Sequence, residues 1–307
     1  MVKPQKIALA PNARKERREA ILHKGLGLSF IWIFLILMYI PILVLVASSF
    51  TDTPVLGTWN GFSFKLYLDL FRDEEILRAL GNTVILALTA ATIATILGTC
   101  GAIGVFYSSK KWTRRLVENV TQIPVVNAEI VIALSLVVMF VFAGTYVFAG
   151  ANLFSFWTLL IGHVILALPF VYLNVKPKLR QMDPALYEAA LDLGCTQNQA
   201  LWKATMPEIF PGIASGFLLS VTLSLDDFIV TAFTRGAGLL SEEKSIETLS
   251  TLVQAKIKKG PIPPAMRALT TLIFAAVLLT VIGLTIYRNV KAKQSKARKG
   301  REEHNHG

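Results

Sequence analysis

Two adjacent carboxylates interrupt a long apolar run in the last third of the chain. Asp226 and Asp227 lie inside the run 213–234, and Asp226 stands 13 residues after the start of that run. In a helix this separation is about 20 Å, which is deep within a bilayer. A carboxylate at such a depth costs about 2.5–3.5 kcal/mol on insertion scales, so it normally faces a cavity, a partner or a pathway. Acidic residues in this position suit a cationic solute.

Other side chains are candidates to complete a cation pathway around this pair. They are one further acid and three aromatic rings capable of cation–π contacts: Glu129, Tyr172, Phe228 and Phe233. Glu129 is expected near the cytoplasmic end of its apolar run. Neighbouring helical residues point about 100° apart, so we expect one aspartate to line the pathway while the other caps or braces a helix. The alternative is that both aspartates fix helix packing, through hydrogen bonds to the backbone or to a partner subunit.

A polar loop at 176–208 offers a second kind of chemistry, the docking of a partner. Asp183 followed by Pro184 predicts a helix start, since aspartate caps the first turn and proline suits the first position. Gly194 predicts a turn, and residues 197–203 predict a second short helix. Two prolines then predict a break in the backbone before the next apolar run: Pro207 and Pro211. By shape alone, the loop is a short helical hairpin at a membrane surface.

The elements that must position these residues are long apolar runs. The chain is 53% hydrophobic and only 17% charged, with a mean hydropathy of +0.55, and such values are typical of a polytopic membrane protein. Six runs have about the 20 residues that cross a bilayer as a helix: 26–49, 83–107, 125–148, 154–175, 213–234 and 269–287. The predicted fold is therefore an all-α membrane protein with six transmembrane helices.

The distribution of positive charge predicts the orientation of these helices. With the N-terminus inside, 22 of the 31 Lys and Arg residues fall on the cytoplasmic side, which places both termini and the loop 176–208 in the cytoplasm. Segments 1–25 and 288–307 are then basic cytoplasmic ends that contact anionic lipid, and 50–77 is an extracytoplasmic loop. The run 26–49 is too long for a signal-peptide core, so we expect a retained anchor.

Composition and motifs also exclude several classes of function. The net charge of +11 is concentrated at the two ends, beside membrane spans, which argues against nucleic-acid binding. Neither Cys100 and Cys195 nor the scattered histidines have metal-ligand spacing. The sequence contains no GxxxxGK(S/T) phosphate loop, so energy must come from a gradient or from another subunit. We expect no catalytic residue, metal or cofactor in this chain.

The polar loop resembles the EAA loop of binding-protein-dependent ABC importer permeases. The resemblance rests on five residues: Glu188, Ala189, Ala190, Gly194 and Pro207. It implies a type I (MetI-like) permease of a bacterial cell membrane, in which this loop forms a coupling helix that sits in a groove of an ATPase subunit. Ala204 and Met206 stand where the family prefers an aliphatic pair, which departs from the pattern outside its central residues.

The resemblance further implies a set of partners and a mechanism. Two copies of an ATPase subunit would bind ATP and magnesium, and a second, homologous permease would share the pathway. An extracytoplasmic solute-binding protein would deliver the solute to an outward-facing state. Transport by alternating access is the expected mechanism, with ATP-driven closure of the ATPase pushing on the coupling helix.

The resemblance covers about 78–287, the expected permease core of five spans. Segments 79–83 and 123–131 are similar to the starts of the family's core helices. Three more segments narrow the resemblance to the spermidine/putrescine permeases of the PotC type: 224–228, 248–263 and 268–272. The implied cargo is a polyamine. Three basic residues of the last outer loop are expected to meet acidic patches on the binding protein: Lys256, Lys258 and Lys259.

Two alternatives stay open at this point. Permeases for phosphonate, ferric iron or other small solutes share the EAA loop and the same architecture. A gradient-driven carrier or channel that works alone is also compatible with six spans, intramembrane acids and basic ends. Inverted repeats would support a secondary carrier, but no clear internal repeat is visible.

Overall fold

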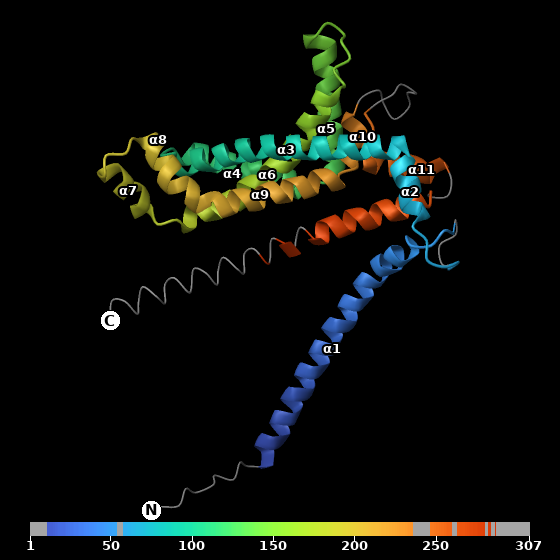
Figure 1. Ribbon diagram of the computed structural model, residues 1–307. Helices are drawn as coiled ribbons and strands as arrows, with labels where there is room; N and C mark the ends of the chain where they lie inside the picture. The colour runs from blue at the N-terminus through green and yellow to red at the C-terminus, as the bar shows by residue number, and fades with distance from the viewer. Residues whose placement is uncertain are drawn as a thin grey trace, which may run out of the picture. The chain divides into compact units, whose positions relative to one another are not determined.

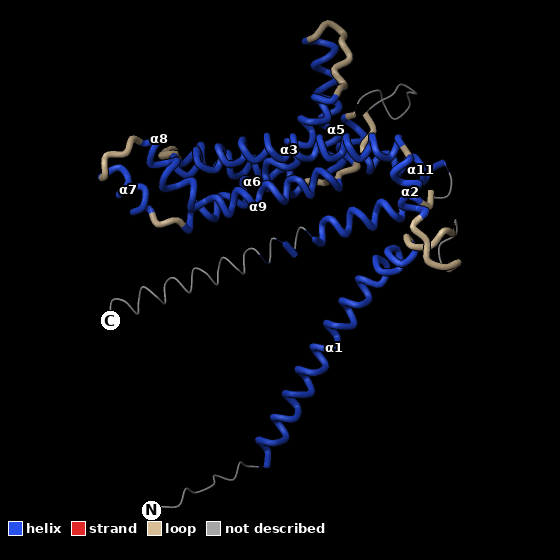
Figure 2. The backbone as a smooth tube through the Cα atoms, in the orientation of Figure 1, coloured by secondary structure: helices blue, strands red, loops and turns tan. Residues whose placement is uncertain are grey.

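The computed structural model describes residues 11–53, 58–235, 246–259 and 263–279, together with residues 282, 283 and 286. These residues form helices and loops, and no strand is present among them (Figure 2). The chain divides into two compact units, the first formed by Met1–Arg72 with Pro263–Gly307 and the second by Asp73–Ile262.

The first unit contains the N-terminal helix and the last helix of the described chain. Helix α1 (Pro11–Ser48) includes the apolar stretch Ser29–Ser48, which is long enough to cross a membrane. Its large apolar side chains are exposed, as lipid contact requires. The amphipathic helix α2 (Lys65–Arg72) and the apolar helix Ala265–Leu279 belong to the same unit.

Three long helices form the centre of the second unit: α3 (Glu74–Tyr107), α6 (Phe156–Gln181) and α9 (Met206–Asp226). They lie side by side along one bundle (Figure 1). Leu86, Leu159 and Ile209, one from each helix, are buried in a shared core cluster. The helix faces that carry these buried residues are the faces along which α3, α6 and α9 pack together.

Shorter helices complete the second unit: α4 (Lys111–Val126), α5 (Glu129–Phe142), α7 (Pro184–Asp192), α8 (Gln197–Ala200), α10 (Ile229–Thr234) and α11 (Leu249–Lys259). Two π-helical turns join them, with η1 (Ala143–Val147) extending α5 and η2 (Leu201–Thr205) leading into α9. Helices α7 and α8 lie at one end of the bundle and α10 and α11 at the other, while α5 projects from it (Figure 1).

Small residues let the three central helices approach closely. A Cβ added at Gly216 of α9 would lie 3.1 Å from the Val171 Cα of α6, and one at Gly98 of α3 would lie 2.8 Å from the Val171 Cβ. Because backbone atoms cannot move aside as a side chain can, Gly216 sets the distance between α6 and α9.

We expect Gly216→Val to destabilise the protein by about 1–3 kcal/mol, the usual cost of overpacking a core. The measurement is thermal unfolding of the detergent-purified protein, and a lower melting temperature is expected. Gly104→Val is the matched control, because a Cβ at Gly104 of α3 meets nothing within 4 Å. An unchanged melting temperature for Gly216→Val would contradict the close α6–α9 packing.

The structure contains helices at the positions of the predicted spans, but with different first and last residues. Five helices are long and apolar enough to cross a membrane: Ser29–Ser48, Glu74–Tyr107, Glu129–Val147, Phe156–Gln181 and Gln197–Asp226. They correspond to the first five predicted runs. The sixth run, 269–287, overlaps the shorter apolar helix Ala265–Leu279, and most of its remaining residues lie outside the described chain. The all-α membrane fold is confirmed, and the count of six is not established.

Two predicted spans are not continuous helices. The run 125–148 was expected to form one helix, but the chain leaves the helical conformation at Asn127 and Ala128, between α4 and α5. The run 213–234 is likewise interrupted at Asp227 and Phe228, between α9 and α10. Apolar composition does not report such breaks, because helix and loop can be equally hydrophobic.

The prediction of a break at Pro207 and Pro211 was wrong. Pro207 occupies the first turn of α9, and the helical backbone runs through it without a break from η2. Pro211 lies inside α9, which continues to Asp226, and the Ser215 hydroxyl donates to the Pro211 carbonyl at 2.7 Å. The irregular backbone occurs one turn earlier, in the π-helical turn η2.

Candidate functional site

The Asp227 carboxylate holds the break between α9 and α10 together. It accepts hydrogen bonds from the backbone amides of Val230 at 3.2 Å and Thr231 at 2.8 Å, and from the Thr231 hydroxyl at 2.9 Å. The hydroxyl of Ser250 donates to the Asp227 carbonyl at 2.9 Å. Asp227 is buried. Its side chain therefore satisfies the free amides at the start of α10, the bracing role expected for one of the two aspartates.

A histidine from α6 completes this network. The His163 ring lies between the Ser224 hydroxyl of α9, 2.7 Å from Nδ1, and the Thr231 hydroxyl of α10, 2.9 Å from Nε2. Its Nε2 is also 3.6 Å from an Asp227 carboxylate oxygen, and both side chains are only 1% exposed. A single imidazole thus joins the helices on the two sides of the break. Sequence reasoning missed His163; its signal was a lone polar ring inside the apolar run 154–175.

Asp226, by contrast, is exposed on the surface of this subunit, in the last turn of α9. Helix C-termini carry a partial negative charge, so the end of α9 adds to the attraction that this carboxylate exerts on a cation. Phe228 follows in the break and is half-buried. The two adjacent aspartates therefore differ in role, one turned into the protein and one outward.

Glu129 is the second exposed carboxylate at this place. It stands in the first turn of α5, directly after the α4–α5 break, and lies within electrostatic range of Asp227 and Asp226. Helices α5 and α10 share a buried cluster that includes Leu136 and Val230, which brings the two breaks together. Glu129 was expected near the cytoplasmic end of its span, and it is the first residue of the apolar helix Glu129–Val147. Its electrostatic interaction with Asp227 and Asp226 puts that end of the helix beside the acidic pair.

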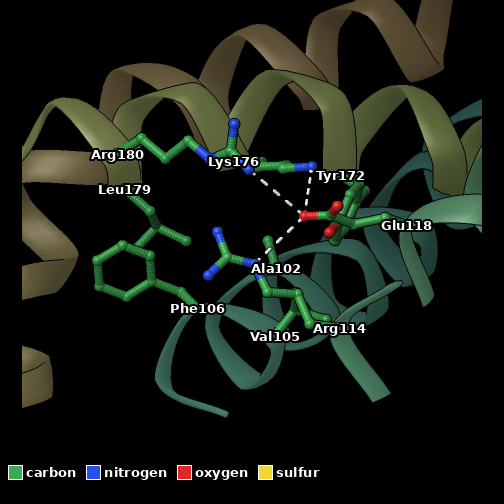
Figure 3. Close-up of a pocket in the computed structure, with 9 residues that line it drawn as sticks. All are labelled: Ala102, Val105, Phe106, Arg114, Glu118, Tyr172, Lys176, Leu179 and Arg180. Atoms are coloured by element: carbon green, nitrogen blue, oxygen red, sulfur yellow. Dashed lines mark hydrogen bonds and ion pairs between the residues drawn. The ribbon is translucent and has the colours of Figure 1, made fainter. Parts of the chain in front are cut away.

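Tyr172 does not belong to this acidic site. It lies nine residues after His163 on α6, about 13 Å further along the helix. Its side chain is buried and lines a pocket with Glu118 of α4 and Lys176 of α6 (Figure 3). The structure therefore does not bring Tyr172 together with the aspartates, and a role for it in the pathway stays a prediction.

The loop 176–208 has the predicted form of helix, turn and helix. The Asp183 carboxylate accepts a hydrogen bond from the Ala185 amide at 3.0 Å, and Pro184 begins α7. Gly194 has φ of +85°, a left-handed conformation that side chains with a Cβ rarely adopt. The Thr196 side chain then caps α8.

The outer face of this loop is available to a partner. Glu188 and Ala189 are exposed, Ala190 is half-buried, and α7 has no buried residue. Leu193 is 85% exposed, so the loop presents a large apolar side chain at its surface. On the inner side, the Tyr187 ring packs 5.1 Å from the Tyr107 ring at the end of α3. The loop is therefore anchored on one side and open on the other.

The outer lysines are not equivalent. Lys256 of α11 forms ion pairs with Glu75 at 2.8 Å and Asp73 at 3.6 Å, at the start of α3. Burial lowers the pKa of Lys256, but the two carboxylates more than offset this and hold its pKa above its ordinary value. Lys258 is exposed. Lys256 was expected to contact a binding protein, but its ion pairs lie within this chain. The side chain of Lys259 lies outside the described residues.

Comparison with known proteins is consistent with this geometry. Residues 94–296 match the family described as binding-protein-dependent transport system inner membrane component. The chain is 31% identical over 256 residues to the spermidine/putrescine transport system permease protein PotC of Escherichia coli (strain K12), covering 83% of this chain and 91% of that protein. It is 33% identical over 247 residues to the putrescine transport system permease protein PotI of the same strain, covering 78% and 82%.

A solved structure shares the fold. It is a bacterial ABC transporter involved in the import of the acidic polysaccharide alginate, with a TM-score of 0.68 and 21% identity. The match covers 90% of this chain and 96% of that chain. At this identity, the similarity supports the arrangement of helices and not the choice of solute.

Proposed function

Because this chain belongs to the family of binding-protein-dependent transport system inner membrane components, and is thus a non-catalytic permease subunit of an ABC importer, we propose that its cargo is a polyamine. The observation that carries the proposal is the pair of exposed carboxylates, Asp226 and Glu129, at two adjacent helix breaks. The named activities of the PotC and PotI relatives support the same cargo.

The chemistry of the site suits a flexible diamine or triamine. Two separated carboxylates can each pair with an ammonium group of one extended molecule, and such charge-assisted hydrogen bonds are stronger than neutral ones. Phe228 adds apolar surface for the methylene groups between the charges. A phosphonate would meet like charges here, and this repulsion disfavours the anionic alternative. A carrier that works alone is disfavoured by membership of the ABC importer family.

The partners are proposed on the same basis. The exposed face of α7, with Glu188, Ala189 and Ala190, contacts an ATPase subunit, of which two copies bind ATP and magnesium. A second, homologous permease completes the pathway, and an extracytoplasmic binding protein delivers the polyamine. The loop 176–208 and both termini lie in the cytoplasm, and the outward-facing and inward-facing states alternate.

Reconstitution of the whole complex tests this function. We expect ATP hydrolysis and uptake into vesicles to require the binding protein, and putrescine or spermidine to stimulate hydrolysis several-fold. Phosphonate and ferric iron are the comparison solutes, and neither is expected to stimulate. Stimulation by phosphonate or iron, with polyamines inert, would replace the proposed cargo while leaving the importer class intact.

A further inference from the structure

Helix α2 has three different faces, although it contains only 8 residues. Leu66 and Leu70, one turn apart, are buried. A second face carries exposed charged side chains at helical spacing: Lys65, Asp69 and Arg72. The third face is apolar, and its three large side chains are 57%, 58% and 62% exposed: Phe64, Leu68 and Phe71. An exposed apolar face beside a charged face indicates a helix that lies between hydrocarbon and water.

The segment that contains α2 is attached to the end of α1. The Phe50 ring, just after α1, stacks on the Phe62 ring with 5.2 Å between the ring centroids. The Ser63 amide donates to the Phe50 carbonyl at 2.7 Å. The hydroxyls of Ser49 and Tyr67 lie 2.8 Å apart, which joins the end of α1 to α2 itself. Helix α2 is therefore held at the level where α1 ends.

That level is the edge of the hydrocarbon. The apolar stretch of α1, Ser29–Ser48, has 20 residues and spans about 30 Å, the thickness of the hydrocarbon core. Trp59, between α1 and α2, is 58% exposed, and tryptophan is typical of the membrane–water interface. Lys65 and Asp52 form an ion pair at 3.0 Å with both side chains exposed, so charged groups of the same segment remain in water.

We propose that α2 lies in the plane of the membrane interface, with its apolar face in contact with acyl chains and its charged face directed to water. Lipid is the occupant because this face is continuous with α1, whose large apolar side chains are exposed along the apolar stretch. The first unit is thus attached to the bilayer twice, by the α1 span and by α2 at the surface. The proposal does not depend on which solute is transported.

Spin labelling at neighbouring positions of α2 tests the proposal. The two native cysteines are first replaced, by Cys100→Ser and Cys195→Ser. Single nitroxides are then attached to four variants, in the whole transporter in liposomes of phosphatidylcholine and phosphatidylglycerol: Leu68→Cys, Asp69→Cys, Phe71→Cys and Arg72→Cys. Electron paramagnetic resonance measures collision with oxygen, which concentrates in hydrocarbon, and with a water-soluble nickel chelate. We expect the oxygen-to-nickel ratio to be several-fold higher at positions 68 and 71 than at 69 and 72.

Asp69→Cys and Arg72→Cys are the matched controls, because both positions are equally exposed on the same helix. Val44→Cys gives the value for lipid contact, since Val44 is 52% exposed in the apolar stretch of α1. A ratio near that of Val44→Cys at both apolar positions would support the proposal. Frequent nickel collision at all four positions would place α2 in water and overturn it. Rare collision with both reagents at positions 68 and 71, with or without added binding protein, would also overturn it, since protein would then cover the face.

Discussion

Asp226→Asn is expected to raise the KM for polyamine uptake about tenfold or more, with little change in the amount of folded protein. A charge-assisted hydrogen bond is worth about 1.5–3 kcal/mol, and 1.4 kcal/mol corresponds to a factor of ten. Asp226 is exposed and forms no ion pair within the described chain, so its loss should not disturb the fold. Glu129→Gln should have a similar effect, and the double variant should lose uptake. Uptake is measured in vesicles containing the whole transporter.

Asp227→Asn should behave differently, because Asp227 braces the backbone. An asparagine keeps one acceptor oxygen but places an amide group towards donors that the carboxylate now satisfies, at the Val230 and Thr231 amides. We expect a destabilisation of about 3 kcal/mol, seen as a lower melting temperature and a lower yield. Glu74→Gln is the control for loss of an exposed carboxylate outside the site. Unchanged KM in Asp226→Asn, Glu129→Gln and the double variant would exclude this acidic pair from the pathway.

The parts of the fold that could be predicted are those set by local sequence. Apolar runs of about 20 residues must form helices in lipid, because no other conformation satisfies their backbone groups. The loop at 176–208 was predictable for a similar reason, since the Asp183 cap and the Gly194 turn depend on residues close in sequence. These are the places where propensity and tertiary structure agree.

The breaks inside spans depend on residues far apart in sequence. The α9–α10 break is satisfied by Asp227 locally, but also by His163 from another helix and by Ser250 after it. Nothing in the run 213–234 reports these partners. The same reasoning explains why the sequence did not show that Tyr172 lies apart from the aspartates, since its neighbours Glu118 and Arg114 come from α4. Contacts across helices decide which polar residues share a site, and one sequence does not list them.

The position of α9 connects the two sites physically. The helix begins at Met206, inside the loop 176–208 and directly after the turn η2, and it ends at Asp226. Its 21 residues span about 30 Å. Pro211 and Gly216 lie in its first half, where close contact with α6 leaves no room for independent bending. A displacement of α7 by a bound ATPase is therefore expected to move the acidic end of α9 as one rigid element.

Gly194→Val is expected to uncouple ATP hydrolysis from uptake, lowering uptake per ATP at least tenfold. At φ of +85° a β-branched residue is strongly disfavoured, so the turn between α7 and α8 must change. Nothing lies within 4 Å of a Cβ at this position, so the effect comes from the backbone and not from a steric clash. Gly194→Asn separates these causes, since asparagine tolerates the left-handed region and should retain most of the coupling.

Gly150→Val is the matched control, because Gly150 has φ of +87° and equally open surroundings but lies after α5, away from the loop. It should strain the backbone to a similar degree without lowering uptake per ATP. Glu188→Lys reverses a charge on the exposed face of α7 and should weaken retention of the ATPase during purification. If Gly194→Val takes up as much solute per ATP as the unmodified protein, then the shape of this loop does not couple ATP hydrolysis to uptake. The coupling must then depend on another surface of this chain.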